Sequence, residues 1–217
     1  GALVAALLFP LSHRNRLRVA LVCGEEIPTI DLAQVPAADA AARGWRRHLD
    51  RATRVVGPGD RVAEIDLARS QILLEPDPGA ATTAALEDWG FDERAEWAWN
   101  GLSGRNRRRA RRRVDLLDDR GAAGLLLRAR DGWVRDVDTG IEILHSPPDP
   151  GVDIEIRDAP TRHGSISFAL RWHGEHPALL WEVSDPTASF ELRVPSFVAG
   201  WSTREPVGET LLHTASG

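Results

Sequence analysis

The spacing of hydrophobic positions divides the chain into regions. Over residues 36–135 apolar residues recur every three or four positions, which is the spacing of amphipathic helices. Beyond residue 135 they alternate with polar residues, as they do along half-buried β-strands. The pattern therefore predicts a fold of the α+β class, in which a helical region over 36–135 is followed by an antiparallel β-sandwich over 136–217.

Helical spacing and boundary signals predict five helices in the first of these regions. Gly57, Pro58 and Gly59 end the first helix, and Asp60 and Asp92 stand where an N-terminal cap is expected. Helices joined by such short breaks favour helical hairpins, that is, part of an α/α arrangement. The predicted helices are residues 37–54, 60–73, 80–89, 92–99 and 122–133.

Six short strands are predicted after residue 135. The clearest alternation puts Ile166, Phe168 and Trp172 on one face of a strand, so we expect Trp172 in the core. Turn residues around Gly174 predict a hairpin with the next strand, which would bring Trp172 close to Trp181. The predicted strands are Gly140–Leu144, Val152–Arg157, Ser165–His173, Ala178–Val183, Ser189–Val194 and Glu209–His213.

Residues 1–35 contain two apolar stretches, 1–11 and 17–22, and predict the end of a β region. The first stretch contains Pro10, is too short to cross a bilayer and lacks the basic start of a signal peptide. We therefore expect no membrane partner, and the missing signal slightly favours the cytoplasm. Because residue 1 is not Met, we also expect the chain to be a C-terminal piece of a longer protein.

Composition and charge narrow the function classes. Hydrophobic residues make up 42% of the chain and charged residues 27%, which is typical of a folded globular protein. The 27 Lys and Arg positions are all arginine, and this indicates a GC-rich coding sequence, such as that of a GC-rich bacterium. Residues 121–217 hold 8 arginines against 14 acidic residues, so nucleic acid is not an expected partner. Cys23 is the single cysteine, which excludes an internal disulfide.

One segment resembles a known family. Residues 159–164, Ala-Pro-Thr-Arg-His-Gly, form a turn that leads into the alternating strand ending at Trp172. This resembles the C-terminal β-sandwich of six-hairpin glycosidases, notably the α-L-rhamnosidase-like group, and the resemblance covers residues 121–217. It implies that the chain is the C-terminal, non-catalytic portion of a glycoside hydrolase-like protein that processes carbohydrate. The catalytic barrel of that family needs more helices than the five predicted, so the resemblance assigns no catalytic residue.

The resemblance also implies partners. These are a carbohydrate or the missing N-terminal part of the same protein, and no cofactor is implied. If the chain belongs to an enzyme, that enzyme is a glycoside hydrolase. The alternative, motivated by the missing barrel, is a stand-alone binding or interaction protein that presents its β-sandwich and an Arg-rich helix to a partner.

The acidic and aromatic segment over residues 88–99 is the candidate carbohydrate-binding site. Glycoside cleavage uses two carboxylates, and an indole ring can stack on a sugar. In the alternative interpretation Asp88 ends one helix, Asp92 caps the next, and the tryptophans pack the joint between them. The candidate residues are Asp88, Trp89, Asp92, Glu93, Trp97 and Trp99.

The stretch over residues 105–113 is the most basic part of the chain. An arginine cluster can bind phosphate groups or an anionic surface. Because Glu93, Asp115, Asp118 and Asp119 are near in sequence and partly cancel the charge, we interpret the cluster as a solvated helix face. Its members are Arg105, Arg107, Arg108, Arg109, Arg111, Arg112 and Arg113.

Two further patterns do not lead us to expect a metal site or a catalytic nucleophile. His163, His173 and His176 come closest to a metal-ligand pattern, but no cysteine joins them and the last two flank a turn, so we expect no metal site. Ser202 lacks the Gly-x-Ser-x-Gly surroundings of a hydrolase nucleophile.

Overall fold

The computed structural model describes residues 31, 36–174, 176–188 and 190–212. Apart from Asp31, the predicted β region over 1–35, with Cys23, lies outside the described residues. The chain divides into two units, residues 1–45 and 46–217, and helix α1 (Ala38–Leu49) contains the boundary between them. The second unit holds the remaining described helices and strands.

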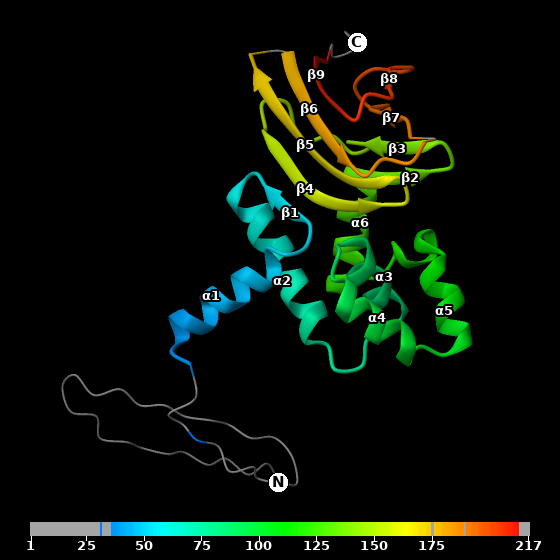
Figure 1. Ribbon diagram of the computed structural model, residues 1–217. Coiled ribbons are helices and arrows are strands. Elements are labelled where there is room, and N and C mark those ends of the chain that lie inside the picture. Colours follow the sequence, from blue (N-terminus) through cyan, green and yellow to red (C-terminus); the bar gives the residue numbers. More distant parts are fainter. Residues whose placement is uncertain (1–30, 32–35, 175, 189, 213–217) are drawn as a thin grey trace, which may run out of the picture. The chain divides into compact units, whose positions relative to one another are not determined.

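Helices α2 to α6 form the helical part of the second unit (Figure 1). α3 lies at its centre: it contacts α2, α4, α5 and α6, and Ala84, Ala85 and Leu86 are completely buried. Among the described residues no helix is both long and apolar enough to cross a membrane. The bounds are α2 Gly59–Leu74, α3 Ala80–Asp88, α4 Asp92–Gly101, α5 Gly104–Arg111 and α6 Ala122–Trp133, with a short 3-10 helix, η1, over Arg113–Leu116.

The two predicted aspartate caps are wrong. Pro58 and Phe91 occupy the N-cap positions of α2 and α4, and neither makes a side-chain cap bond. Asp60 and Asp92 lie in the first turn of these helices instead. There a negative charge still interacts favourably with the helix dipole, so the residues mark the helix starts without capping them.

The β part consists of two sheets, so the predicted α+β class is confirmed. The five-stranded sheet has the order β1-β4-β5-β6-β9 and is antiparallel throughout. The four-stranded sheet has the order β2-β3-β7-β8, and β3 and β7 run parallel, unlike the predicted antiparallel arrangement. The strands are β1 Arg54–Val56, β2 Val134–Val137, β3 Gly140–Ile143, β4 Ile154–Thr161, β5 Gly164–His173, β6 His176–Ser184, β7 Leu192–Arg193, β8 Ser202–Thr203 and β9 Val207–Leu211.

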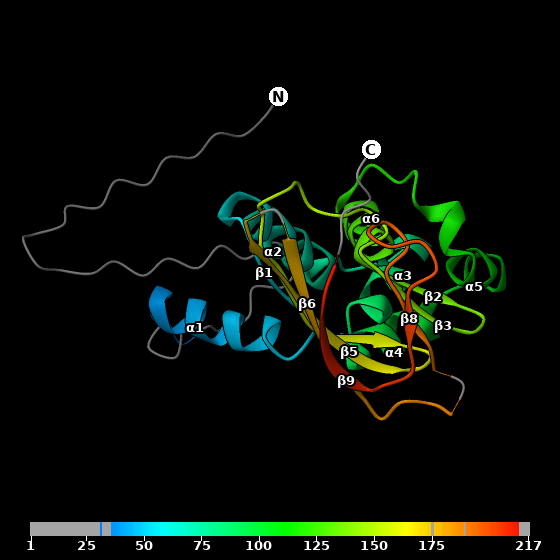
Figure 2. The same cartoon turned by 90° about the horizontal axis from the view of Figure 1, so that it is seen from above.

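The four-stranded sheet lies against one face of the five-stranded sheet (Figures 1 and 2). Phe168 on β5 pairs with Trp181 on β6, and both side chains are buried. Ile141 and Leu192, which pair in the four-stranded sheet, are fully buried. These side chains form the core between the sheets. We call the opposite side of the five-stranded sheet its outer face.

The β5–β6 hairpin is confirmed, but its register separates the two predicted neighbours. Trp181 lies opposite Phe168, whereas Trp172 lies opposite Pro177, near the end of the hairpin. Trp172 is only half-buried, and its ring contacts Phe197 with 6.5 Å between centroids. Trp181 instead makes an edge-on contact of 5.6 Å with Trp201.

Strand β1 links the helical part to the sheets. The predicted first helix extends to Arg54, but α1 ends at Leu49, and Arg54 begins a strand that pairs with Arg157 on β4. The β-branched Val55 and Val56 suit a strand. Likewise Val134 and Arg135, predicted to belong to the helical region, begin β2.

Candidate functional site

Trp89 is a core residue. It is 1% exposed, and its indole Nε1 donates a hydrogen bond of 3.1 Å to the backbone carbonyl of Leu126 on α6. The guanidinium of Arg69, itself buried, lies 5.7 Å from the centre of the indole ring. Trp89 therefore fastens α3 to α6 and offers no open ring face to a sugar.

Asp88, the last residue of α3, is joined to Arg113. Arg113 Nε lies 2.9 Å from Asp88 Oδ2, and Arg113 Nη2 lies 2.9 Å from Asp88 Oδ1. Burial raises the pKa of the Asp88 carboxyl, although the positive charges of Arg113 and Arg130 oppose this effect. A raised pKa can mark a general acid. Here both carboxylate oxygens are engaged by one arginine, so the arrangement is that of a structural ion pair.

The other four candidate residues belong to α4. Asp92 and Glu93 are exposed in its first turn, and Trp97, one turn after Glu93, is 50% exposed. Residues four apart share one face of a helix, so α4 brings Glu93 and Trp97 together. The guanidinium of Arg94 lies 4.0 Å from the Trp97 ring centre and covers part of it. Trp99 is half-buried, and its carbonyl accepts a hydrogen bond from Arg107.

The candidate residues thus fall into two groups. Asp88 and Trp89 are held by contacts to η1 and α6, whereas Glu93 and Trp97 share an exposed face of α4. Paired carboxylates for glycoside cleavage must face one cleft. Two surface pockets are described, and neither is lined by Asp88, Asp92 or Glu93.

Arg130 on α6 forms a buried joint that the sequence interpretation missed. Its Nε donates to the carbonyl of Asp88, its Nη1 to that of Val134, and its Nη2 to that of Pro160 on β4 at 2.6 Å. The carboxylate of Asp136 lies 3.9 Å from Nη2. Burial lowers the pKa of Arg130, while the nearby Asp88 and Asp136 oppose this. One side chain therefore connects α3, β2 and β4.

The spacing of apolar residues before Arg130 could have predicted that this arginine is buried. Ala123, Leu126 and Leu127 precede Arg130 by seven, four and three positions and are all buried. Arg130 thus occupies an apolar stripe of α6. A charged residue inside such a stripe needs polar partners in the interior, and backbone carbonyls supply them here.

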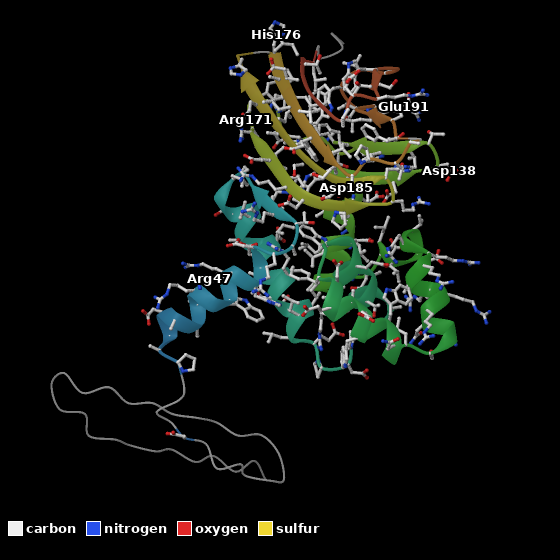
Figure 3. All side chains as sticks on the ribbon, in the orientation of Figure 1. Arg47, Asp138, Arg171, His176, Asp185 and Glu191 are labelled. Carbon is white, nitrogen blue, oxygen red and sulfur yellow. The ribbon has the colours of Figure 1, made fainter. Side chains whose placement is uncertain are left out.

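His163 lies in the interior, whereas His173 and His176 lie at the β5–β6 turn. His163 is buried, and its ring nitrogens lie 3.1 Å from Thr187 Oγ1 and 3.1 Å from the carbonyl oxygen of Val137. His173 and His176 pair across the β5–β6 turn, and Figure 3 shows His176 at the tip of that hairpin. Among the described residues no group of three or more potential ligand side chains comes together around a metal-sized site.

Helix α5 displays the arginine cluster. Ser103 caps its N-terminus by accepting a hydrogen bond from the Asn106 amide, and Ala110 is its buried residue. Arg105, Arg108 and Arg109 follow helical spacing on one side and are exposed, as is Arg112 at the end of the helix. We call the cluster the arginine surface: Arg105, Arg107, Arg108, Arg109, Arg111 and Arg112.

The charge of the arginine surface is not cancelled by ion pairs. Within the part of the chain that the structure describes, none of its six members lies within 4.0 Å of a carboxylate oxygen, whereas the adjacent Arg113 pairs with Glu87 and Asp88. Asp119 is engaged otherwise, since its Oδ1 accepts from the amide of Gly121. The six arginines are thus exposed, as a solvated helix face requires, and none of them is neutralised by a direct ion pair among the described residues.

The outer face of the five-stranded sheet carries a shallow groove of about 660 Å³. On one side of the groove the negative charge of Glu155 is neutralised, because this residue pairs with Arg157 and Arg171. Figure 3 shows Arg171 on the side of the sheet away from the four-stranded sheet. The other side is formed by β6 and β9, where Glu182 and Glu209 have no ion-pair partner among the described residues.

Comparisons of the chain with known protein families, with curated proteins and with solved structures found no match.

Proposed function

We propose that this chain is a non-catalytic binding protein that holds a polyanionic partner on the arginine surface of α5. The observation that carries the proposal is the set of six exposed arginines without a carboxylate partner among the described residues. Residues 104–113 contain seven arginines and no acid. Such a surface attracts phosphate or carboxylate groups and would lose affinity as salt is added.

The chemistry of the surface favours phosphate groups along a polymer. Guanidinium groups bind phosphate through paired hydrogen bonds, and Arg105, Arg108 and Arg109 share one side of the helix, with Arg112 directly after its end. Insertion into a membrane is less well supported, because α5 has no exposed apolar stripe. The phosphate backbone of a nucleic acid is therefore the partner we propose, although the acidic balance of residues 121–217 did not favour nucleic acid in the sequence analysis.

Retention of fluorescein-labelled duplex DNA at a series of salt concentrations tests this proposal. We expect the wild-type chain to bind with an affinity that falls as salt rises. The variant Arg105→Gln/Arg109→Gln/Arg112→Gln should bind more weakly, and the slope of log K against log salt should flatten by about 0.9 per lost phosphate contact.

Arg51→Gln/Arg162→Gln/Arg204→Gln is the matched control, because it removes the same charge from three exposed arginines outside α5. This control should keep nearly the wild-type slope. Equal losses in both triple variants would mean that net charge and not α5 drives binding. Absence of salt-dependent binding would refute the proposal, and preference for polyglutamate over DNA would redirect it to an acidic protein.

A second candidate function follows from Glu93 and Trp97. An exposed carboxylate and a half-exposed indole on one face of α4 are a minimal contact for a sugar. The order of a helical part before two sheets also agrees with the glycosidase resemblance, in which this chain is a non-catalytic portion of a carbohydrate-processing protein. Quenching of tryptophan fluorescence by oligosaccharides, abolished in Trp97→Ala, would support this candidate. Binding unchanged by Trp97→Ala would remove it.

A further inference from the structure

We propose that the free edge of strand β9 binds an extended peptide in which a basic residue lies between two apolar ones, each separated from it by one residue. This surface is distinct from α5 and would hold a partner through strand addition.

β9 is an edge strand whose outward hydrogen-bonding groups can be identified. It pairs with β6 on one side, and no strand within the described residues pairs with its other side. The amide of Val183 donates to Pro206, and that of Leu212 donates to Pro177, so the even-numbered residues face β6. In an antiparallel ladder alternate residues point the other way. The backbone groups of Val207, Glu209 and Leu211 therefore point to the open edge.

These three residues also carry the exposed side chains of the strand. Val207 is 63% exposed and Leu211 is 59% exposed, and Glu209 lies between them on the same outer face. On the neighbouring strand, Leu180 lies directly opposite Glu209 and is 41% exposed. Three of the large exposed apolar side chains of the described chain thus gather on β6 and β9, and such a patch is typical of an interaction surface.

The charge of this patch selects the partner. Glu182 and Glu209 have no cation within ion-pair distance among the described residues, whereas Glu155 across the groove is paired with two arginines. A strand added beside β9 would place its own residues opposite Val207, Glu209 and Leu211. Apolar side chains suit the two ends, and an arginine or lysine suits the centre.

A second copy of this chain fits the edge less well. In the centred antiparallel pairing of β9 with itself, Glu209 would lie opposite Glu209 of the other copy. Like charges directly opposite one another destabilise a strand pair. The observations therefore favour a basic peptide over self-association.

Fluorescence anisotropy with two labelled peptides tests the inference. One is Thr-Val-Thr-Arg-Thr-Val-Thr, and the other has glutamate in place of the arginine. We expect saturable binding of the first peptide and at least tenfold weaker binding of the second. Glu209→Lys should reverse this preference, because it changes an exposed side chain at the centre of the patch. Glu64→Lys, the same charge change at an exposed position on α2, should leave the preference as it is.

Hydrogen exchange gives a second measurement that does not depend on variants. Binding should slow the exchange of the Val207, Glu209 and Leu211 amides and leave those of Gly208 and Thr210 nearly unchanged. Equal affinity for both peptides, no saturable binding, or protection elsewhere in the chain would overturn the inference. A dimer whose formation protects the same three amides would replace the peptide by a second copy.

Discussion

Arg113 donates hydrogen bonds from two of its nitrogens to the carboxylate of Asp88, although the two residues are 25 positions apart in the sequence. The pair ties the end of α3 to η1, and a third contact joins Arg113 to Glu87. Both partners are less than one third exposed, so the surrounding solvent screens their attraction only in part.

A double-mutant cycle should detect this pair. Asp88→Asn and Arg113→Gln should each lower the free energy of unfolding, and the double variant should lose less than the sum, with a coupling of about 1–2 kcal/mol. Urea unfolding of the four proteins measures the coupling. A value near zero would mean that solvent screens the pair completely.

Trp89→Phe should weaken the core without affecting any ligand. The substitution keeps an aromatic ring but removes the indole N–H that donates to the Leu126 carbonyl, and the smaller ring no longer fills the buried space between α3 and α6. The free energy of unfolding should fall by about 1–3 kcal/mol. If Trp89→Phe instead abolished oligosaccharide binding while stability stayed constant, the residue would belong to a site and not to the core.

Gly208→Ala should destabilise the sandwich. A Cβ at this position would lie 2.4 Å from the Trp181 ring, which packs directly over β9. Because the Trp181 Nε1 is anchored to the carbonyl of Glu205 at 2.9 Å, the ring cannot easily withdraw. We expect a loss of about 1–3 kcal/mol in thermal or urea unfolding. Gly59→Ala serves as control, since a Cβ there meets no atom within 4 Å and the residue is the first one inside α2, so this change should not lower stability.

Glu155 should contribute stability that is lost in acid. Burial alone would raise its pKa, but hydrogen bonds and charges from Arg157 and Arg171 hold the pKa below the usual value of 4.5. A carboxyl with a lower pKa in the folded state stabilises that state above pH 4.5. The contribution disappears as the pH falls through the folded-state pKa.

Unfolding of Glu155→Gln at a series of pH values measures this contribution. The variant should be less stable than the wild type at pH 7, and the difference should shrink as the pH falls below 4.5 and through the lowered folded-state pKa. Arg157→Gln/Arg171→Gln should show the same trend. A stability difference that does not change with pH would show that Glu155 titrates alike in the folded and unfolded chain.

The spacing of apolar residues and the turn residues between them were sufficient to predict most of the helices and strands. The alternation of Ile166, Phe168 and Leu170 and the turn at Gly174 predict the β5–β6 hairpin, because pairing of neighbouring strands depends on nearby residues. Strand β1 could not be predicted in this way. It has three residues, and its partner β4 follows only after the entire helical part.

The surfaces were harder to predict than the elements. The sequence shows that residues 105–113 are basic, but which of these arginines form ion pairs depends on side-chain distances: Arg113 does, and the six members of the arginine surface do not within the described residues. The edge of β9 is invisible in sequence, since a strand is an edge only by virtue of what pairs with it. Trp89 and Trp97 have the same residue type and neighbouring positions, and only packing separates a core ring from an exposed one.

The pairing of Arg54 with Arg157 has a consequence for biosynthesis. While the ribosome makes the helices, β1 has emerged but the strand it needs has not yet been translated. A nascent chain that stops after α6 would hold an unpaired strand and would lack the Pro160 carbonyl that Arg130 binds. The contacts of β4 with β1 and with Arg130 therefore form only after β4 has left the exit tunnel, so we expect the joint between helices and sheets to form late in synthesis.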